Sequence, residues 1–266
     1  MNRMPITEVG GLKLSRILCG TNWILGYSHQ TNSKDRMIKE IMDEKRVVEI
    51  LCTCIKNGIN AVMGPPSEFL VNCIEKAKEK MGKDLIYICT PWKIEEVEWA
   101  KEKGAKICMP HTSVTDTYVN KREKNLKGIE IWLKKIRENG MIPGLSTHLP
   151  ETIIYADSTG IDVETYIQIY NPIGFLCNIE VEWIYKIINE AKKPVMIIKP
   201  FAGGRITPFV GLNFVVNTIR DIDMITIGFS SPYEVDEDVE IFLSIIEKRK
   251  PELEYQITRS KKSLEK

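Results

Sequence analysis

The feature that most constrains the fold is a regular alternation of short apolar segments with longer amphipathic ones. Eight segments of strand length are rich in β-branched residues, and eight segments with helical periodicity separate or follow them. The strand-like segments are 16–23, 60–64, 85–92, 106–111, 142–148, 166–171, 194–200 and 224–230, and the helix-like segments are 38–57, 67–81, 94–103, 121–138, 150–157, 179–191, 212–220 and 232–248. Strands that are apolar on both faces are typical of parallel sheets covered by helices. The sequence therefore predicts an α/β fold, a single (β/α)8 TIM barrel, with an open doubly wound sheet as the alternative.

The residues before the first predicted strand indicate an extra element. Two short runs flank Gly10 and Gly11 within residues 6–14, which is the pattern of an N-terminal β-hairpin that could plug the bottom of a barrel. We expect the barrel to occupy residues 1–248 and a charged, solvated tail to occupy residues 249–266.

Composition excludes several classes of protein. The chain has 37 Lys and Arg residues and 36 Asp and Glu residues. A net charge of +1 does not create the positive electrostatic potential that non-specific nucleic-acid binding needs, so we do not expect a nucleic-acid-binding protein. The longest apolar runs are strand-sized, which argues against a membrane span, and the start MNRMPITEV has no apolar core of a signal peptide. Seven cysteines without a CxxC pair indicate free thiols. We expect a cytoplasmic protein whose partner is a small molecule.

Histidines gather at the predicted strand ends. The chain has three, and His29, His111 and His148 each lie at or just beyond the carboxyl end of a strand. In a barrel these ends meet at one mouth, where active sites lie. With Lys199 and Glu68, the histidines are the candidate acids and bases, and a lysine that ends an apolar strand can act as a base, form a Schiff base or bind an anion. A zinc site made by His111, His148 and Glu68 is an alternative without motif support, and no metal is predicted.

Two later loops have the chemistry of an anion site. After the seventh strand, Gly203 and Gly204 allow close backbone approach and Arg205 can grip an anion, although the glycines can equally make a turn. After the eighth strand, Ser230 and Ser231 precede Pro232, so a helix should begin there with free backbone N–H groups. Residues 221–247 contain no Lys or Arg, so a bound nucleotide would be matched better without a 2′-phosphate.

Several phrases, in order along about residues 4–248, resemble the aldo-keto reductases. LKLSRILCGTNW at 12–23 resembles the family's first strand, GLSTH at 144–148 its fifth, and QIYNP at 168–172 its sixth, with one residue fewer between Gln and Tyr. KPFAGG at 199–204 and GFSSPYEV at 228–235 resemble the bacterial and archaeal branch that often carries an iron–sulfur tail, without the cysteines of that tail. The resemblance implies NAD or NADP as a possible cofactor. The residues that would hold it are Gly20, Thr21, Asn22, Ser146, Thr147, Gln168, Gly203, Gly204, Arg205, Ser230 and Ser231.

The resemblance stops at the catalytic residues. The family uses an Asp-Tyr-Lys-His tetrad to reduce a carbonyl, and in this chain the expected Asp and Tyr are absent from residues 58–68, Pro91 stands where the Lys belongs, and His111 alone matches. Loss of a positioned acid typically costs about 10²- to 10⁴-fold in rate. The sequence predicts an enzyme of altered chemistry on a small carbonyl, sugar or phosphate-bearing metabolite. The alternatives are an NAD(P)-dependent oxidoreductase that uses His111 or His148 as the acid, and a non-catalytic metabolite-binding barrel.

Overall fold

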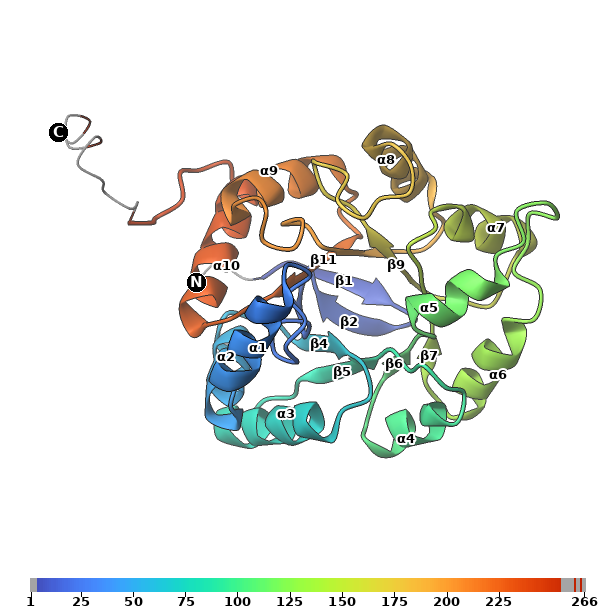
Figure 1. Cartoon of the computed structure of the whole chain (residues 1–266), viewed down its shortest axis with the longest axis horizontal. Helices are drawn as coiled ribbons and strands as arrows, with labels where there is room; N and C mark the ends of the chain where they lie inside the picture. The colour runs from blue at the N-terminus through green and yellow to red at the C-terminus, as the bar shows by residue number, and fades with distance from the viewer. Residues whose placement is uncertain (1–3, 255–260, 262–263, 265–266) are drawn as a thin grey trace.

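The computed structural model describes residues 4–254 together with Lys261 and Leu264, and its main body is a ring of parallel strands surrounded by helices (Figure 1). The order in the ring is β7-β6-β5-β4-β3-β11-β10-β9-β8, and all of these neighbours pair in parallel. The strands are β3 (Ile17–Gly20), β4 (Ala61–Gly64), β5 (Ile86–Cys89), β6 (Ile107–Cys108), β7 (Ile142–Pro143), β8 (Leu145–Ser146), β9 (Tyr166–Ile169), β10 (Val195–Ile198) and β11 (Met224–Gly228). The predicted TIM barrel is confirmed.

The ring closes at a single short stretch of chain. β7 pairs with β6 and β8 pairs with β9, and only Gly144 separates the two strands. The predicted fifth strand is therefore present as two halves, each bonded to a different neighbour. A Cβ at Gly144 would lie 2.7 Å from the carbonyl oxygen of Thr165 and 2.8 Å from Sδ of Met109, so only glycine fits at the closure.

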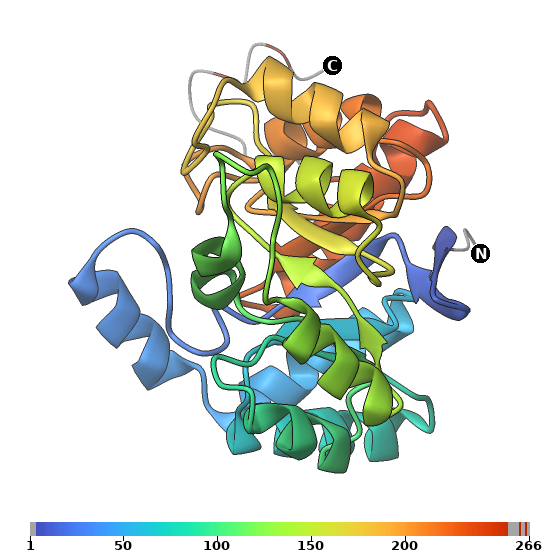
Figure 2. The same cartoon turned by 90° about the vertical axis from the view of Figure 1, so that its right-hand side faces the viewer.

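The predicted hairpin plugs the ring. β1 (Ile6–Val9) and β2 (Leu12–Ser15) pair antiparallel around Gly10 and Gly11, whose φ angles of 55° and 83° suit the tight turn. Val9 and Leu14 are fully buried in the cluster inside the barrel, beside Leu18, Ile107 and Met224. Figure 2 places the hairpin at the end of the molecule opposite the projecting helix α1.

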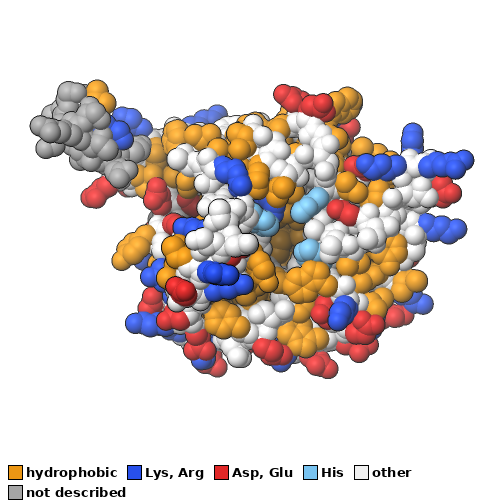
Figure 3. Space-filling view, viewed as in Figure 1, with side chains coloured by type: hydrophobic (Ala, Val, Ile, Leu, Met, Phe, Trp, Pro, Cys, Tyr) orange, Lys and Arg blue, Asp and Glu red, His pale blue; other side chains and the backbone are white. Residues whose placement is uncertain are grey.

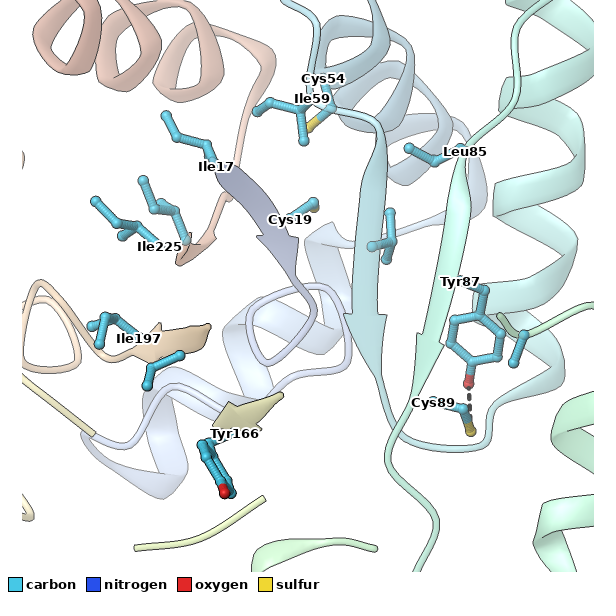
Figure 4. Close-up of a cluster of buried hydrophobic side chains, with 14 of the residues drawn as sticks. Ile17, Cys19, Cys54, Ile59, Leu85, Tyr87, Cys89, Tyr166, Ile197 and Ile225 are labelled. Atoms are coloured by element: carbon cyan, nitrogen blue, oxygen red, sulfur yellow. Dashed lines mark hydrogen bonds between the residues drawn. The ribbon is translucent and has the colours of Figure 1, made fainter. Parts of the chain in front are cut away.

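A second, larger core lies between the strands and the helices. Residues that point outward from the ring, such as Ile17, Cys19 and Ile225, pack there against helix residues such as Cys54 (Figure 4). All seven cysteines lie within the described residues and are free thiols, as predicted. The alternation of inward and outward side chains along each strand produces the two cores.

The helices follow the predicted order, and the main differences are at the first and fourth predicted helices. The first predicted helix is two helices, α1 (Asn32–Ile41) and α2 (Glu44–Lys56), because the Asp43 side chain caps a new helix. The fourth is shorter than expected, and short α5 (Thr112–Thr115) and η1 (Asp116–Tyr118) precede it. The others are α3 (Glu68–Met81), α4 (Glu96–Glu102), α6 (Glu130–Glu138), α7 (Glu151–Thr159), α8 (Val181–Glu190), α9 (Pro208–Thr218) and α10 (Pro232–Ile246).

The predicted tail at 249–266 lies largely outside the described residues. Its first residue, Arg249, forms an ion pair with Glu240 on α10. No helix within the described part of the chain combines the length and apolar character needed to cross a bilayer.

Candidate functional site

A cavity of about 920 Å³ opens at the carboxyl ends of the barrel strands. Figure 3 shows histidine side chains around a hollow in the middle of this face. His29, His111, His148 and Lys199 all line the cavity, and they come from the loops after β3, β6, β8 and β10. Other lining residues that the sequence indicated are Gly20, Thr21, Asn22, Ser146, Gly203, Gly204, Arg205 and Ser230, and Trp23 and Trp92 add aromatic walls. The barrel thus brings together the residues that the strand ends indicated.

Lys199 is the charged centre of this group. Its Nζ lies 3.2 Å from Nε2 of His29, and Asn22 Nδ2 lies 2.8 Å from the same nitrogen. Because the Asn22 amide nitrogen and the ammonium form of Lys199 can only donate, Nε2 of His29 accepts, which places the ring proton on Nδ1. Burial lowers the pKa of Lys199 to about 8. A substantial fraction of this amine is therefore neutral near physiological pH.

The charge of Lys199 acts on all three histidines. Burial, followed by Lys199, lowers the pKa of His29, of His111 and of His148, and in His148 the value falls to about 4. The other two histidines lower the pKa of His148 further. The imidazoles are consequently neutral at pH 7, able to accept a proton or to donate an N–H hydrogen bond.

His111 is held in a defined orientation. Its Nδ1 accepts a hydrogen bond from the backbone N–H of Ser113 at 3.2 Å, which leaves the proton on Nε2. The ring also packs against Trp92, with centroids 5.4 Å apart. His111 therefore begins α5 as its cap and presents one face to the aromatic wall.

Arg205 joins two loops of the mouth. Its guanidinium donates to the carbonyl oxygens of Ala202 and His29, both at 3.1 Å, and lies 3.9 Å from the ring centroid of Phe175. Gln30 Nε2 adds a second link, at 2.9 Å, to the carbonyl of Gly203. The sequence predicted that Arg205 would grip an anion, which stays a prediction, and in the structure two of its N–H groups hold the β3–α1 loop against the β10–α9 loop.

The start of α10 also differs from the expected anion site. The Glu234 carboxylate accepts from the backbone N–H of Ser230 at 2.7 Å and from its hydroxyl at 2.6 Å, while Ser231 caps the Glu234 N–H. Glu234, Glu237 and Asp238 line the cavity here. Burial, with help from the two glutamates, raises the pKa of Asp238 to about 8. At pH 7 the Asp238 carboxyl is therefore mostly protonated, and the carboxylates of Glu234 and Glu237 make this end of the cavity acidic.

Four residues that the sequence indicated do not line the cavity. Glu68 lies on the outer surface, where it accepts from Trp99 Nε1 and pairs with Lys103, both at 2.9 Å. Gln168 follows Ile167, which lines the cavity, so it faces the helices, fully buried. Thr147 turns toward Asp116, and Ser231 caps α10. With Glu68 outside, the zinc alternative loses its third ligand, and no group of three or more potential metal ligands occurs among the described residues.

Asp116 is a residue that the sequence reasoning missed. Its carboxylate accepts from the hydroxyls of Thr147 and Thr112 and, at 3.3 Å, from the backbone N–H of His148. Burial raises its pKa. Asp116 thus fixes the end of β8 where His148 begins the loop. The available signal was weak, a single acidic residue in the threonine-rich run TSVTDT after the fourth strand.

The fit to a nicotinamide dinucleotide is uneven. Thr21, Asn22 and Ser146 offer hydrogen-bonding groups on the cavity wall, and the carboxylates of Glu234 and Glu237 suit ribose hydroxyls. The same carboxylates oppose a 2′-phosphate, and Gln168 faces away. The wall between β4 and α3 presents Met63, Gly64 and Pro65, which supply no acid or base.

Comparisons with known proteins place the fold. No model of a protein family matches the sequence, and no curated protein matches it. Among solved structures, a Pseudomonas aeruginosa protein provisionally assigned to the aldo-keto reductases superimposes with a TM-score of 0.64 at 14% identity, over 91% of this chain and 94% of that one. A glycerol dehydrogenase from Gluconobacter oxydans gives 0.61 at 11% identity (98% and 94%). The holo form of a Bacillus halodurans aldo-keto reductase gives 0.60 at 12% identity (96% and 99%). The chain has the barrel fold of the aldo-keto reductases.

Proposed function

We propose that the protein is an enzyme that binds a small carbonyl compound in the cavity and works on it by proton transfer, with a degenerate form of the reductase tetrad. The observation that carries the proposal is the convergence of Lys199 with His29, His111 and His148 on one cavity. Perturbed titrating groups that share a cavity are typical of catalytic sites.

The chemistry follows from the protonation states of these groups. A Lys199 ammonium polarises a carbonyl oxygen, and the neutral amine acts as a base, since its pKa of about 8 allows both forms. The neutral imidazoles of His111 and His148 either accept a proton from the carbon beside the carbonyl or donate an N–H to its oxygen. Trp92 and Trp23 keep one side of the cavity apolar, which strengthens these interactions.

A proton-exchange assay in D2O tests this proposal. The protein is incubated with glycolaldehyde, pyruvate, dihydroxyacetone and dihydroxyacetone phosphate, and deuterium entry beside the carbonyl is followed by NMR. We expect catalysed exchange with at least one compound, a loss of about 10²-fold in His111→Gln or His148→Gln, and no change in the control Glu68→Gln. Binding without exchange or product would favour the metabolite-binding barrel, and no binding by any compound would contradict the proposal.

A second candidate function is NAD-dependent reduction with His111 or His148 as the proton donor. The observation in its favour is that Thr21, Asn22 and Ser146 line the cavity of a barrel with the aldo-keto reductase fold. Bound NADH would supply the hydride, while His111 or His148 would protonate the substrate oxygen in its imidazolium form, which the lowered pKa values of both residues make a minor form at pH 7. A thermal-shift titration discriminates this candidate: we expect a shift with NADH and a smaller one with NADPH, because Glu234 and Glu237 oppose the extra phosphate. The absence of a shift with either nucleotide removes it.

A further inference from the structure

Lys199 occupies a position in which its amine faces the cavity with no acidic partner. It follows the last residue of β10 in a left-handed conformation, with φ of 59°, and its side chain lines the cavity. Its amine lies within hydrogen-bond distance of the imidazole of His29. Within the described part of the chain no carboxylate forms an ion pair with it, and burial alone accounts for the shift in its pKa.

These surroundings are those of a nucleophilic amine. A lysine that is desolvated and left without a counter-ion loses the stabilisation of its ammonium form, so the free amine forms readily. A structural lysine would instead be expected to pair with an acid, as Lys193, which precedes β10 at the opposite end of the barrel, pairs with Glu164 at 2.9 Å. The acidic residues of the cavity, Glu234, Glu237 and Asp238, belong to α10 and do not contribute to the pKa of Lys199.

His29 lies next to the Lys199 amine, in a position to accept a proton from it. Its Nε2 lies 3.2 Å from Nζ of Lys199 and 2.8 Å from Nδ2 of Asn22, so the lysine and the Asn22 amide share the single lone pair of that nitrogen. The Arg205 guanidinium fixes the His29 backbone, and Asn22 fixes the ring. The relay is therefore held in place before any substrate arrives.

We propose that Lys199 forms a covalent iminium (Schiff base) with the carbonyl carbon of the substrate, with His29 as the group that moves the proton between the lysine nitrogen and the departing oxygen. This inference rests on the proposed function, because it deepens the way in which the same cavity treats a small carbonyl compound.

The step balances without an added reactant. The Lys199 ammonium first gives one proton to Nε2 of His29, and the free amine then adds to the carbonyl carbon while the C=O π bond opens. The oxygen receives the proton held on His29 and a second proton that His29 moves from the Lys199 nitrogen, passing through the carbinolamine, and the C–O bond then breaks with the loss of water. Overall, a lysine ammonium and a carbonyl compound give a protonated imine and one molecule of water, so charge and atoms are conserved. The iminium then acidifies the neighbouring C–H, which His111 or His148 can deprotonate.

Reductive trapping tests this inference. The purified full-length protein is incubated with glycolaldehyde, pyruvate or dihydroxyacetone phosphate, sodium borohydride is added, and the modified peptide is identified by mass spectrometry. We expect one adduct on Lys199 with at least one probe. The total yield of adduct should be at least tenfold lower in Lys199→Arg, and the adduct should form about tenfold more slowly in His29→Asn. Lys193→Arg is the matched control, because Lys193 lies outside the cavity and pairs with Glu164, so the adduct on Lys199 should form as in the unmodified protein.

The outcomes separate the two proposals. If a probe binds by ligand-observed NMR and undergoes exchange but borohydride traps no adduct on Lys199, or traps one only on another lysine, the iminium is overturned and the proposed function stands. If no probe binds at all, the proposed function falls and the iminium falls with it. Both outcomes are decided with the unmodified protein, in which mass spectrometry identifies the lysine that carries the adduct. Poor folding of the Lys199→Arg variant therefore does not affect them.

Discussion

Lys199 and His29 are 170 residues apart in the sequence, yet Nζ of one lies 3.2 Å from Nε2 of the other, and both residues adopt left-handed backbone, with φ of 59° and 56°. Non-glycine residues in this region cost about 1–2 kcal/mol each. Two such residues meeting across a cavity indicate that contacts of the surrounding loops offset this strain and hold the amine against the imidazole.

The first prediction concerns the reactivity of this amine. Labelling of Lys199 by a slow amine acylating reagent should rise with pH and reach half its maximum near pH 8, because the neutral amine is the reactive form. An unperturbed lysine in a short peptide titrates near 10.4 and serves as the reference. Site-resolved mass spectrometry across pH 6–11 measures both. A Lys199 curve that coincides with that of the peptide would show that the site does not lower the pKa of the amine.

The second prediction concerns the link between the two mouth loops. In Arg205→Lys the single ammonium cannot reach the carbonyls of both Ala202 and His29, so the β3–α1 loop should open more often. We expect amide hydrogen exchange in residues 28–31 to rise about tenfold, with little change in the barrel strands.

Arg36→Lys is the control for this change, since it makes the same replacement on α1 at a residue that does not line the cavity. Equal exchange in Arg205→Lys and in the unmodified protein would mean that Arg205 does not hold the loops together. If the Arg205→Lys variant also lost the ability to bind inorganic phosphate, that result would support the anion-binding role that the sequence indicated for Arg205.

The fold was predictable because its determinants are periodic. Local spacing along the sequence determines the alternation of strand-like and helix-like segments, the glycine pair at the hairpin and the position of the three histidines after strands. Because a barrel brings the carboxyl ends of its strands together, this spacing also predicts that the histidines lie close to one another. The break between α1 and α2 was missed because continuous helical periodicity outweighed one capping residue, Asp43.

The site was predictable only to the level of the loop. Whether Gln168 or its neighbour Ile167 faces the cavity depends on the register of β9 in the ring, and a one-residue difference reverses the side chain. The roles of Arg205, Glu234 and Asp116 depend on partners in other loops, which the sequence does not place. Glu68 lies beyond the strand end, on a helix that turns its side chain to the surface.

The third prediction concerns the closure of the barrel. In Gly144→Ala the new methyl group would overlap the backbone oxygen of Thr165, which belongs to the adjoining chain segment and cannot move freely. We expect a loss of about 3 kcal/mol in the free energy of unfolding, at the upper end for overpacking. Gly160→Ala is the comparison, because its Cβ would meet open space and only its φ of 69° is unfavourable, at about 1 kcal/mol. Urea unfolding at pH 7 measures both, and equal losses would contradict the steric explanation.

The fourth prediction concerns stability in acid. The pKa of His148 is about 4 in the folded protein, whereas an unfolded histidine titrates near 6.5. Between these two values the unfolded chain binds more protons than the folded one, so stability falls as the pH drops from 6.5 to 4 and does not depend on this group above 6.5. The loss attributable to His148 should be about 2–3 kcal/mol. His148→Gln removes the titrating group, so its unfolding free energy should fall less steeply over this window than that of the unmodified protein. Urea titrations at pH 7, 6, 5 and 4.5 measure the difference, and parallel curves for the two proteins would mean that His148 accepts a proton in the folded cavity as easily as in water.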